Sequence, residues 1–267
     1  MNKNVVLITG VSSGIGRATA ELLARNGYKV FGGARSPEKA SAVKDVTIVP
    51  IDVRDDASVK AGVESVLERA GRIDVLINNA GYSIIGAVEE TSPAEAQALF
   101  DTNVFGILRM SRAVLPTMRA QGSGRIINLS SVLGFLPAPF MGLYAATKHA
   151  VEGLSESLDH EVRNFGIRVV LIQPSFTRTG LDTNAAPTVG RIPAYVDQFT
   201  RTIAAVTAKI KGAPEPESVA ERILLAIEKP YRMRHPADGR AALLSKLRRF
   251  MPAGPVDKSL RKEFALS

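Results

Sequence analysis

The 267 residues contain no cysteine, and this absence excludes disulfide bridges, thiolate metal sites and cysteine nucleophiles within them. A chain without cysteine fits a reducing compartment, so we expect a cytoplasmic location. Long apolar runs are missing as well, and none approaches the roughly 18 residues of a membrane-spanning helix. The first apolar run, Val5 to Ile8, is shorter than the apolar region of a signal peptide. Neither secretion nor a membrane span is therefore expected.

Histidine is scarce too, and the three present, His149, His160 and His235, do not have the spacing of a metal-ligand cluster. We therefore predict no metal site. His149 directly follows Lys148, and adjacent residues of a helix point in different directions. A packed or solvated His149 is favoured over a catalytic one.

The excess of positive charge is confined to one end of the chain. The 34 Lys and Arg and the 26 Asp and Glu give a net charge of +8. Residues 229–267 hold ten basic and three acidic side chains, a surplus of seven that leaves the rest of the chain nearly neutral. No recognised nucleic-acid-binding module accompanies this surplus, so a nucleic-acid partner is not expected.

The basic end also carries an apolar stripe at helical spacing. Its members are Leu243, Leu244, Leu247 and Phe250, interleaved with Lys246, Arg248 and Arg249. A basic amphipathic pattern of this kind suits peripheral contact with a membrane surface. The favoured alternative is that the stripe packs on the domain while the charges face water.

Short runs rich in Val and Ile alternate with longer segments of helical periodicity, which is typical of βαβ units around a parallel sheet. Strands are predicted at Val5 to Thr9, Lys29 to Gly33, Thr47 to Ile51, Val75 to Asn78, Arg125 to Leu129 and Arg168 to Ile172, with a short seventh near Arg232. The expected fold is α/β, a Rossmann-type doubly wound parallel sheet of about seven strands with helices on both faces, in three layers. We expect a single domain over residues 1–267, with a substrate-covering segment at about 180–215 and a basic C-terminal extension at about 231–267.

Capping signals mark two helix starts, one at Ser92, Pro93 and Glu95 and the other at Ser218 with Glu221. Residues 180–193 are rich in turn formers, and a helix is predicted after them from Tyr195 to Lys211.

A glycine-rich turn follows the first predicted strand and opens a helix. Its predicted phosphate-binding residues are Gly10, Ser12, Ser13, Gly14, Ile15 and Gly16. Glycines let the backbone approach a pyrophosphate closely, and the helix N-terminus presents N–H groups to an anion. The spacing Gly-x-x-x-Gly-x-Gly differs from the commoner dinucleotide fingerprint, so a purely structural tight turn is the alternative.

The residue that follows the second strand indicates which nicotinamide cofactor binds. An acidic residue there would bind the ribose 2′-hydroxyl of NAD, whereas this chain has Arg35, whose guanidinium suits the 2′-phosphate of NADP. NADP(H) is therefore the predicted cofactor, the alternative being that Arg35 is a solvated loop charge.

Tyr144 and Lys148 stand four residues apart at the start of a predicted helix, so phenol and ammonium share one face. A nearby ammonium favours the phenolate and lowers the pKa of a tyrosine, which prepares it for proton transfer. The pair alone is weak evidence, because a helix-surface pair has the same spacing. Ser131 ends a predicted buried strand at the carboxyl edge of the sheet, where open α/β folds bind ligands.

Together these motifs resemble the short-chain dehydrogenase/reductase family, of the compact type, over nearly the whole chain. The resemblance rests on the glycine-rich turn, Asn78 to Gly81, Asn103, Ser131, Tyr144 with Lys148, and Pro174 to Thr179. It implies that Tyr144 is the acid and base and that Ser131 binds the substrate oxygen. Lys148 would also bind the nicotinamide ribose, and Asn103 would hold a water of a proton relay.

The resemblance further implies the rest of the cofactor site. Asp52 with the Val53 backbone would meet the adenine, and Asn79, Ala80 and Gly81 would line the cofactor. The implied set also includes Pro174, Thr177 and Thr179, with Thr179 on the carboxamide. Ser175 departs from the family's usual glycine, so a local backbone adjustment is expected.

The expected activity is NADP(H)-dependent interconversion of a carbonyl and an alcohol. The basic extension and the turn resemble the hydroxysteroid and retinol dehydrogenase-like branch, and a homodimer or homotetramer is implied. Residues 135–141, between Ser131 and Tyr144, are largely apolar and form either a wall for an apolar substrate or part of the core. The alternatives are a 3-oxoacyl-thioester reductase and a catalytically silent NADP(H)-sensing protein.

Overall fold

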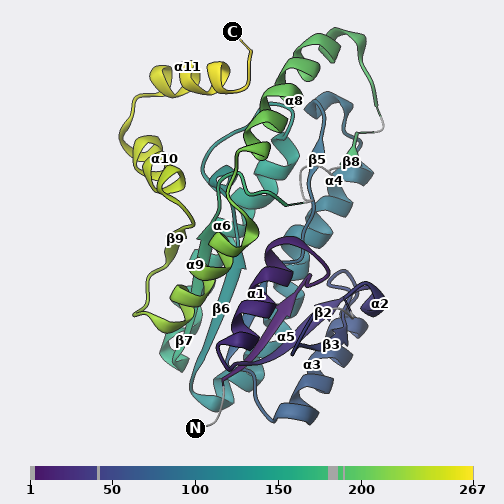
Figure 1. Cartoon of the computed structure of the whole chain (residues 1–267), viewed down its shortest axis with the longest axis vertical. Helices are drawn as coiled ribbons and strands as arrows, with labels where there is room; N and C mark the ends of the chain where they lie inside the picture. Colours follow the sequence, from purple (N-terminus) through teal and green to yellow (C-terminus); the bar gives the residue numbers. More distant parts are fainter. Residues whose placement is uncertain (1–3, 41–42, 180–185, 189, 267) are drawn as a thin grey trace.

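The computed structural model describes residues 4–40, 43–179, 186–188 and 190–266, and its centre is a parallel sheet of seven strands (Figure 1). The strand order is β3-β2-β1-β4-β6-β7-β9, which is the doubly wound topology that the sequence predicts. The strands are β1 (Val5–Thr9), β2 (Lys29–Ala34), β3 (Thr47–Pro50), β4 (Val75–Asn78), β6 (Gly124–Leu129), β7 (Ile167–Gln173) and β9 (Arg234–Pro236).

The central strands are buried on both faces, as their unbroken Val and Ile runs predict. Alternate side chains of β1 divide between two cores, with Val6 and Ile8 on one face and Val5 and Leu7 on the other. Helices α1 (Gly14–Arg25) and α9 (Pro216–Glu228) cover the first face. The second face is covered by α3 (Asp56–Ala70), α5 (Gly106–Gln121) and the C-terminal end of α6 (Gly142–Val162).

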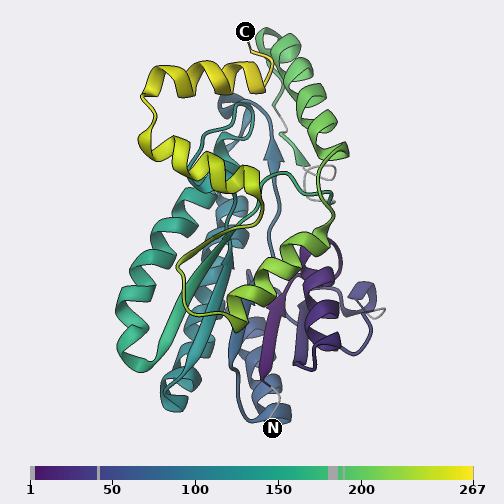
Figure 2. The same cartoon turned by 60° about the vertical axis from the view of Figure 1, so that its left-hand side comes forward.

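The remaining elements are short or lie beyond the carboxyl ends of the strands. They are α2 (Pro37–Ala40), β5 (Ile84–Ile85), α4 (Pro93–Phe100), β8 (Ala186–Pro187), α8 (Val196–Lys211), α10 (Gly239–Phe250) and α11 (Ala253–Glu263). Both ribbon views place α8, α10 and α11 at the end of the molecule to which the strands point (Figures 1 and 2). Of the predicted covering segment, residues 180–185 and 189 lie outside the described residues.

The two predicted capping boxes have different outcomes. The first is confirmed, because the Ser92 hydroxyl accepts from Glu95 N while the Glu95 carboxylate accepts from Ser92 N. The second is wrong: α9 begins at Pro216, so Ser218 lies inside its first turn and its hydroxyl donates to the Glu215 carbonyl at 2.8 Å. Proline has a fixed φ suited to the first helical position, and it starts the helix earlier than the serine signal indicates.

The predicted seventh strand near Arg232 is β9, which begins two residues later and pairs in parallel with β7. The helix predicted from Tyr195 is confirmed as α8, which a short 3-10 turn at Pro193–Tyr195 precedes. Within the described parts of the chain, no helix combines the length and the hydropathy that crossing a bilayer requires.

Candidate active site

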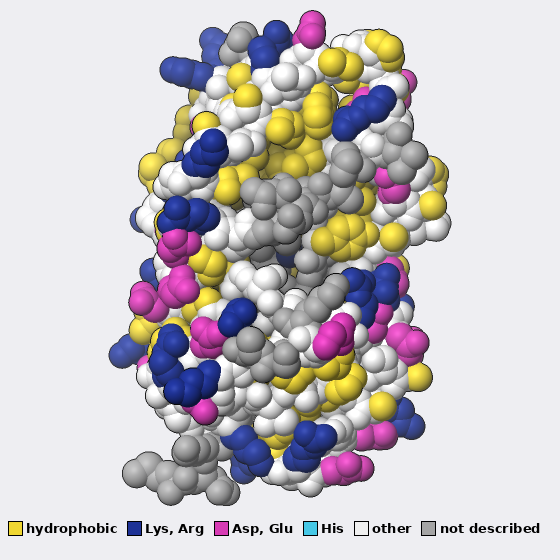
Figure 3. Space-filling view, turned by 45° about the vertical axis from the view of Figure 1, so that its right-hand side comes forward, with side chains coloured by type: hydrophobic (Ala, Val, Ile, Leu, Met, Phe, Trp, Pro, Cys, Tyr) yellow, Lys and Arg dark blue, Asp and Glu magenta, His cyan; other side chains and the backbone are white. Residues whose placement is uncertain are grey.

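A cavity of about 790 Å³ opens at the carboxyl edge of the sheet. In the space-filling view, hydrophobic side chains gather in the upper half of this face, with lysine and arginine side chains around them (Figure 3). The predicted site residues that line the cavity are Gly10, Ser12, Ser13, Gly14, Ile15, Arg35, Asp52, Val53, Asn79, Ala80, Gly81, Ser131, Tyr144, Lys148, Pro174, Thr177 and Thr179. Gly16 and Asn103 are the two predicted residues that do not line it.

The glycine-rich turn has the geometry that a phosphate cradle requires. Gly10 and Gly14 have φ values of +74° and +56°, which other L-residues rarely adopt. A Cβ on Gly16 would lie 2.2 Å from the Gly10 carbonyl oxygen, so Gly16 supports the turn from behind the lining. Ser13 caps α1 without a side-chain hydrogen bond, which leaves the first-turn N–H groups directed at the cavity. These residues fit a dinucleotide pyrophosphate.

A hydrogen-bonded clasp joins this turn to the end of β4. The Thr9 hydroxyl accepts from Asn79 N at 3.1 Å and from Ala80 N at 3.0 Å. In the other direction, Asn79 Nδ2 donates to the carbonyls of Thr9 and Gly10. Thr9 was not among the predicted site residues. Its only signal in the sequence is its place at the end of a buried strand next to the turn.

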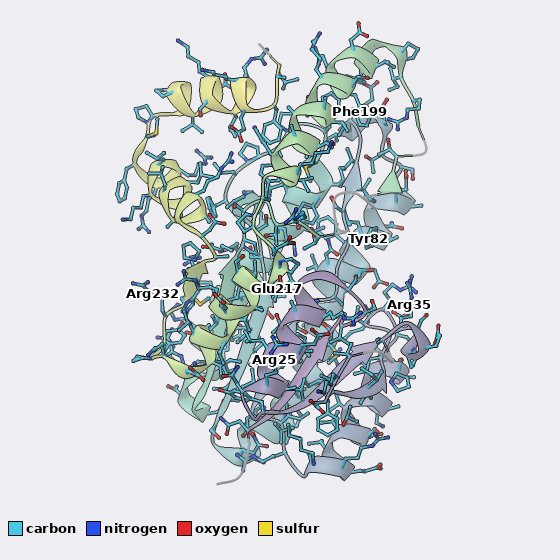
Figure 4. All side chains as sticks on the ribbon, viewed as in Figure 1. Arg25, Arg35, Tyr82, Phe199, Glu217 and Arg232 are labelled. Atoms are coloured by element: carbon cyan, nitrogen blue, oxygen red, sulfur yellow. The ribbon has the colours of Figure 1, made fainter. Side chains whose placement is uncertain are left out.

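Two arginines and one carboxylate surround the predicted adenosine end of the cavity. Arg35 is exposed and follows β2, on the side of the molecule where Tyr82 also lies (Figure 4). Asp52 forms an ion pair with Arg54, at 2.7 Å between Arg54 Nη2 and Asp52 Oδ2. The hydrogen bond from Arg54 lowers the pKa of the Asp52 carboxyl below its usual value. Arg54 also lines the cavity, a place that no sequence motif indicates.

Tyr144, Lys148 and Ser131 meet at the inner end of the cavity. Lys148 is buried, and its Nζ lies 5.5 Å from the centre of the Tyr144 ring. The same ammonium donates to the Leu129 carbonyl at 2.7 Å, which fixes it beneath the end of β6. Burial lowers the pKa of Lys148 from 10.5 to about 8, and the nearby Glu152 carboxylate opposes this change. The ammonium form therefore still predominates at neutral pH.

Asn103 lies in a π-helical turn, Asp101–Phe105, between α4 and α5. Its Nδ2 donates to the Tyr82 carbonyl at 2.9 Å and to the Thr147 hydroxyl at 3.2 Å, and its Oδ1 accepts from Tyr82 N. Single π turns of this kind are frequent at functional sites. Here the turn brings Asn103 against Thr147 of α6, the residue before Lys148. The Asn103 side chain itself does not line the cavity.

Behind Lys148 lies a buried polar network that the sequence does not predict. Glu152, one helical turn after Lys148, is 8% exposed. One of its carboxylate oxygens accepts from the Ser130 hydroxyl at 2.5 Å and from Gln173 Nε2 at 3.0 Å. The other meets Arg234 Nε of β9 at 3.1 Å. A fixed negative charge thus stands behind the predicted catalytic ammonium.

Replacing Glu152 by Gln should lower the pKa of Lys148 below its present value of about 8, because the carboxylate favours the ammonium. If the ammonium assists the reaction, turnover falls as rising pH removes its proton. The alkaline limb of kcat/KM for carbonyl reduction should therefore move to lower pH in the variant, measured from about pH 6 to 10.

Glu156→Gln is the matched control, because Glu156 is an exposed carboxylate that pairs with the same Arg234 at 2.9 Å. This control should leave the alkaline limb in place. Equal pH profiles for the Glu152 variant and the wild type would contradict the role of the carboxylate.

The apolar stretch at residues 135–141 and the C-terminal helices both contribute to the cavity. From the stretch, Leu136, Pro137 and Met141 line it, and Leu133 before the stretch lines it as well. Phe140 from the same stretch instead packs edge-on against the Phe199 ring, at 5.5 Å between ring centroids. Phe199 lies on α8 (Figure 4). The stretch therefore serves both as cavity wall and as core.

Helices α10 and α11 contribute Arg240, Leu244, Ser259, Leu260 and Glu263 to the lining, and Phe264, directly after α11, lines it too. From the sequence we predict this segment only as a basic extension, without a part in the site. Ser175, the predicted departure from the family pattern, joins it to the cofactor loop, since its hydroxyl donates to Asp238 Oδ2 at 2.6 Å. Asp238 in turn caps α10 by accepting from Ala241 N at 2.7 Å.

Of the two roles favoured for His149, packed or solvated, the structure shows the solvated one: the side chain is exposed, with Nδ1 2.9 Å from the Ala145 carbonyl. Among the residues that the structure describes, no three His, Asp or Glu side chains form a group suited to a metal ion.

Comparison with known proteins identifies the family that this arrangement represents. Residues 4–190 match the family model of the short chain dehydrogenases. The chain belongs to the short-chain dehydrogenase family. A short-chain dehydrogenase from Streptomyces avermitilis has a solved structure that covers all of this chain and 96% of its own, with 36% identity and a TM-score of 0.82.

Other short-chain dehydrogenases place a nicotinamide cofactor in this fold. A solved structure from Burkholderia phymatum in complex with NAD is 29% identical, covers 93% of each chain and has a TM-score of 0.80. A metagenomic short-chain oxidoreductase in complex with NADP is 28% identical, covers 87% of this chain and 95% of its own, and has a TM-score of 0.70. Among curated relatives, 3-ketodihydrosphingosine reductase of Bacteroides thetaiotaomicron is 35% identical over 271 residues, with complete coverage of both chains. The chain is thus an oxidoreductase with a fold that holds nicotinamide dinucleotides.

Proposed function

We propose that this short-chain dehydrogenase reduces an apolar ketone or aldehyde with NADPH and reoxidises the alcohol in the reverse direction. The observation that carries the proposal is that Tyr144, Lys148 and Ser131 border the same cavity as the glycine-rich turn. A substrate carbonyl beside Tyr144 therefore has room to lie against a dinucleotide that extends to the turn.

In this mechanism Ser131 Oγ donates a hydrogen bond to the carbonyl oxygen and orients it toward Tyr144. The phenol of Tyr144 delivers the proton that the oxygen gains, and the Lys148 ammonium stabilises the phenolate left behind. When bound, the nicotinamide supplies the hydride that reaches the carbonyl carbon. Thr179, Pro174 and Thr177 line the part of the cavity between the turn and Tyr144 and would hold the carboxamide end.

The choice of NADP(H) over NAD(H) rests on Arg35. Replacing Arg35 by Ala should raise the KM for NADPH by roughly 10- to 100-fold, because one charge-assisted contact with the 2′-phosphate is lost. The KM for NADH should change little, since NADH has no phosphate there. Steady-state kinetics with both cofactors measure the difference.

Arg25→Ala is the control for Arg35, because Arg25 is an exposed arginine at the far end of α1 (Figure 4). It should leave both KM values unchanged. An equal loss for NADPH and NADH in the Arg35 variant would show that this arginine does not recognise the phosphate.

An apolar substrate is favoured by the apolar residues of the cavity lining, among them Leu133, Leu136, Met141, Leu260 and Phe264. The name of the Bacteroides relative, a reductase of a long-chain ketone, is in keeping with such a lining. The second candidate, a 3-oxoacyl-thioester reductase, would use the same chemistry on a ketone that also carries a thioester group.

The proposal is tested directly by measuring the loss of NADPH absorbance in the presence of four classes of carbonyl compound: steroid, retinoid, long-chain aliphatic and acyl-thioester. Turnover with one of the first three classes supports it, and turnover with the thioester alone favours the second candidate. Tight NADPH binding without turnover of any class would indicate a cofactor-sensing protein. A homodimer or homotetramer in the cytoplasm remains our expectation, and sedimentation of the purified protein gives the subunit number.

A further inference from the structure

Helix α10 exposes most of the apolar stripe that its sequence carries. Leu243, Leu247 and Phe250 are 56%, 37% and 80% exposed, and Phe250 is the most exposed of the large hydrophobic side chains in the described chain. The expectation that the stripe packs on the domain is wrong for these three residues. Leu244 alone of the stripe lines the cavity. Ala241 is the one residue of α10 that is buried.

The exposed apolar side chains form one face with basic side chains on one side of it. At about 100° per residue, Leu243, Leu247 and Phe250 fall within an arc of roughly 60° on the helix surface. Lys246 lies about 40° beyond one end of this arc and Arg249 about 100° beyond the same end, and both are exposed. We call these five residues the α10 face. No acidic side chain lies on α10, whose preceding Asp238 serves as its cap.

We propose that the α10 face binds the surface of a lipid bilayer that contains anionic lipids. A surface helix of this kind inserts its apolar side chains at the level of the headgroups, while its Lys and Arg side chains pair with lipid phosphates. The surplus of seven positive charges in residues 229–267 gives the whole segment the complementary sign.

A second copy of the chain fits the α10 face less well. In a symmetric dimer the same patch meets itself, so Lys246 and Arg249 would approach their own counterparts. Like charges brought together at an interface are unfavourable, whereas an anionic bilayer offers the opposite charge over a wide area.

The position of α10 connects docking to the cavity. The side of the helix next to the exposed apolar arc contributes Arg240 and Leu244 to the cavity lining, and α10 lies with α11 beyond the carboxyl ends of the strands (Figure 2). A chain seated on the α10 face therefore holds the apolar end of its cavity close to the bilayer. This link between docking and substrate entry rests on the proposed function, since it assumes that the substrate is an apolar carbonyl compound that passes from the lipid to Tyr144.

Flotation of the full-length protein with lipid vesicles tests the docking without any need for turnover. Vesicles of phosphatidylcholine alone are compared with vesicles in which about a third of the lipid is phosphatidylglycerol. We expect binding to the anionic vesicles, weakened by added salt. Lys246→Gln with Arg249→Gln should reduce it roughly 25-fold, about fivefold for each charge.

Leu243→Ser with Phe250→Ser should reduce vesicle binding at least about 100-fold, because two apolar side chains leave the headgroup region. Phe165→Ser with Leu225→Ser is the matched control, since it removes the same two kinds of exposed side chain, here 45% and 38% exposed, from outside α10. This control should float like the wild type, and circular dichroism verifies that all variants are folded.

Activity measurements extend the test to substrate entry. For a long-chain ketone carried in anionic vesicles, the Leu243 and Phe250 double variant should lose roughly tenfold in kcat/KM. For a short, water-soluble ketone its kcat/KM should equal that of the wild type.

Several outcomes would overturn the proposal. They are a wild type that does not float with anionic vesicles, a Leu243 and Phe250 double variant that floats as well as the wild type, and an oligomer that forms in the wild type but not in this double variant. The last result would assign the α10 face to a second copy. Binding to an acidic carrier protein by a chain that ignores vesicles would likewise assign it to a protein partner. Failed flotation with normal turnover overturns the docking alone, and flotation without turnover overturns the proposed function alone.

Discussion

Replacing Tyr144 by Phe should lower kcat for carbonyl reduction by roughly 10² to 10⁴-fold, because the carbonyl oxygen loses its proton donor. NADPH binding should remain close to the wild-type value, since the ring keeps its place among Ile85, Met141 and Val206. Stopped-flow turnover and the quenching or enhancement of NADPH fluorescence measure the two properties separately.

Tyr28→Phe is the matched control for this change. Tyr28 precedes β2 at the amino edge of the sheet, away from the cavity, and its phenol interacts with Glu228. Loss of this hydroxyl should leave turnover unaltered. A Tyr144 variant that retains more than about a tenth of wild-type kcat would rule out the tyrosine as the proton donor.

Replacing Gly16 by Ala should weaken NADPH binding about 100-fold, the loss that a displacement of about 1 Å produces at a site of fixed geometry. The new Cβ would lie 2.2 Å from the Gly10 carbonyl oxygen and 2.3 Å from Asn79 Nδ2. The carbonyl belongs to the backbone and the Asn79 amide holds the clasp to Thr9, so neither moves without opening the turn. Overpacking of this kind also costs about 1–3 kcal/mol of folding free energy.

Gly153→Ala controls for the loss of a glycine in a helix. Gly153 lies in α6, and an added Cβ there meets no atom within 4 Å. This variant should be slightly more stable than the wild type, by about 0.5–1 kcal/mol, with unchanged NADPH affinity. Titration of both variants with NADPH gives the dissociation constants, and an unaffected affinity in the Gly16 variant would show that the turn does not position the cofactor.

Periodicity and apolar runs were sufficient to predict the sheet, because buried parallel strands such as β1 and β4 consist almost entirely of Val, Ile and Leu. The start of α9 was misplaced because Pro216 and Ser218 both signal a helix N-terminus, and sequence alone does not rank them. The packing of α10 was misjudged for a related reason. An apolar stripe shows that a helix has one apolar face, but not whether another part of the chain covers it.

The predicted site residues other than Gly16 and Asn103 share one cavity because parallel strands end at the same edge of the sheet, which follows from topology. Glu152 could not be predicted as part of the site, because its hydrogen-bond and ion-pair partners Ser130 after β6, Gln173 of β7 and Arg234 of β9 meet it only after folding. The same holds for Leu260 and Phe264. More than 100 residues separate them from Tyr144 along the chain, yet Phe264 packs in the same core cluster as the tyrosine.

Helix α11 itself buries none of its residues, yet it forms part of the cavity wall. Its anchor is Glu263, whose carboxylate meets Lys209 of α8 at 2.6 Å and also pairs with Arg240 of α10. Partly exposed ion pairs contribute little free energy and are screened by salt. The α11 part of the cavity wall therefore depends on charge pairs that added salt weakens, whereas the strands beneath it are held by buried apolar side chains.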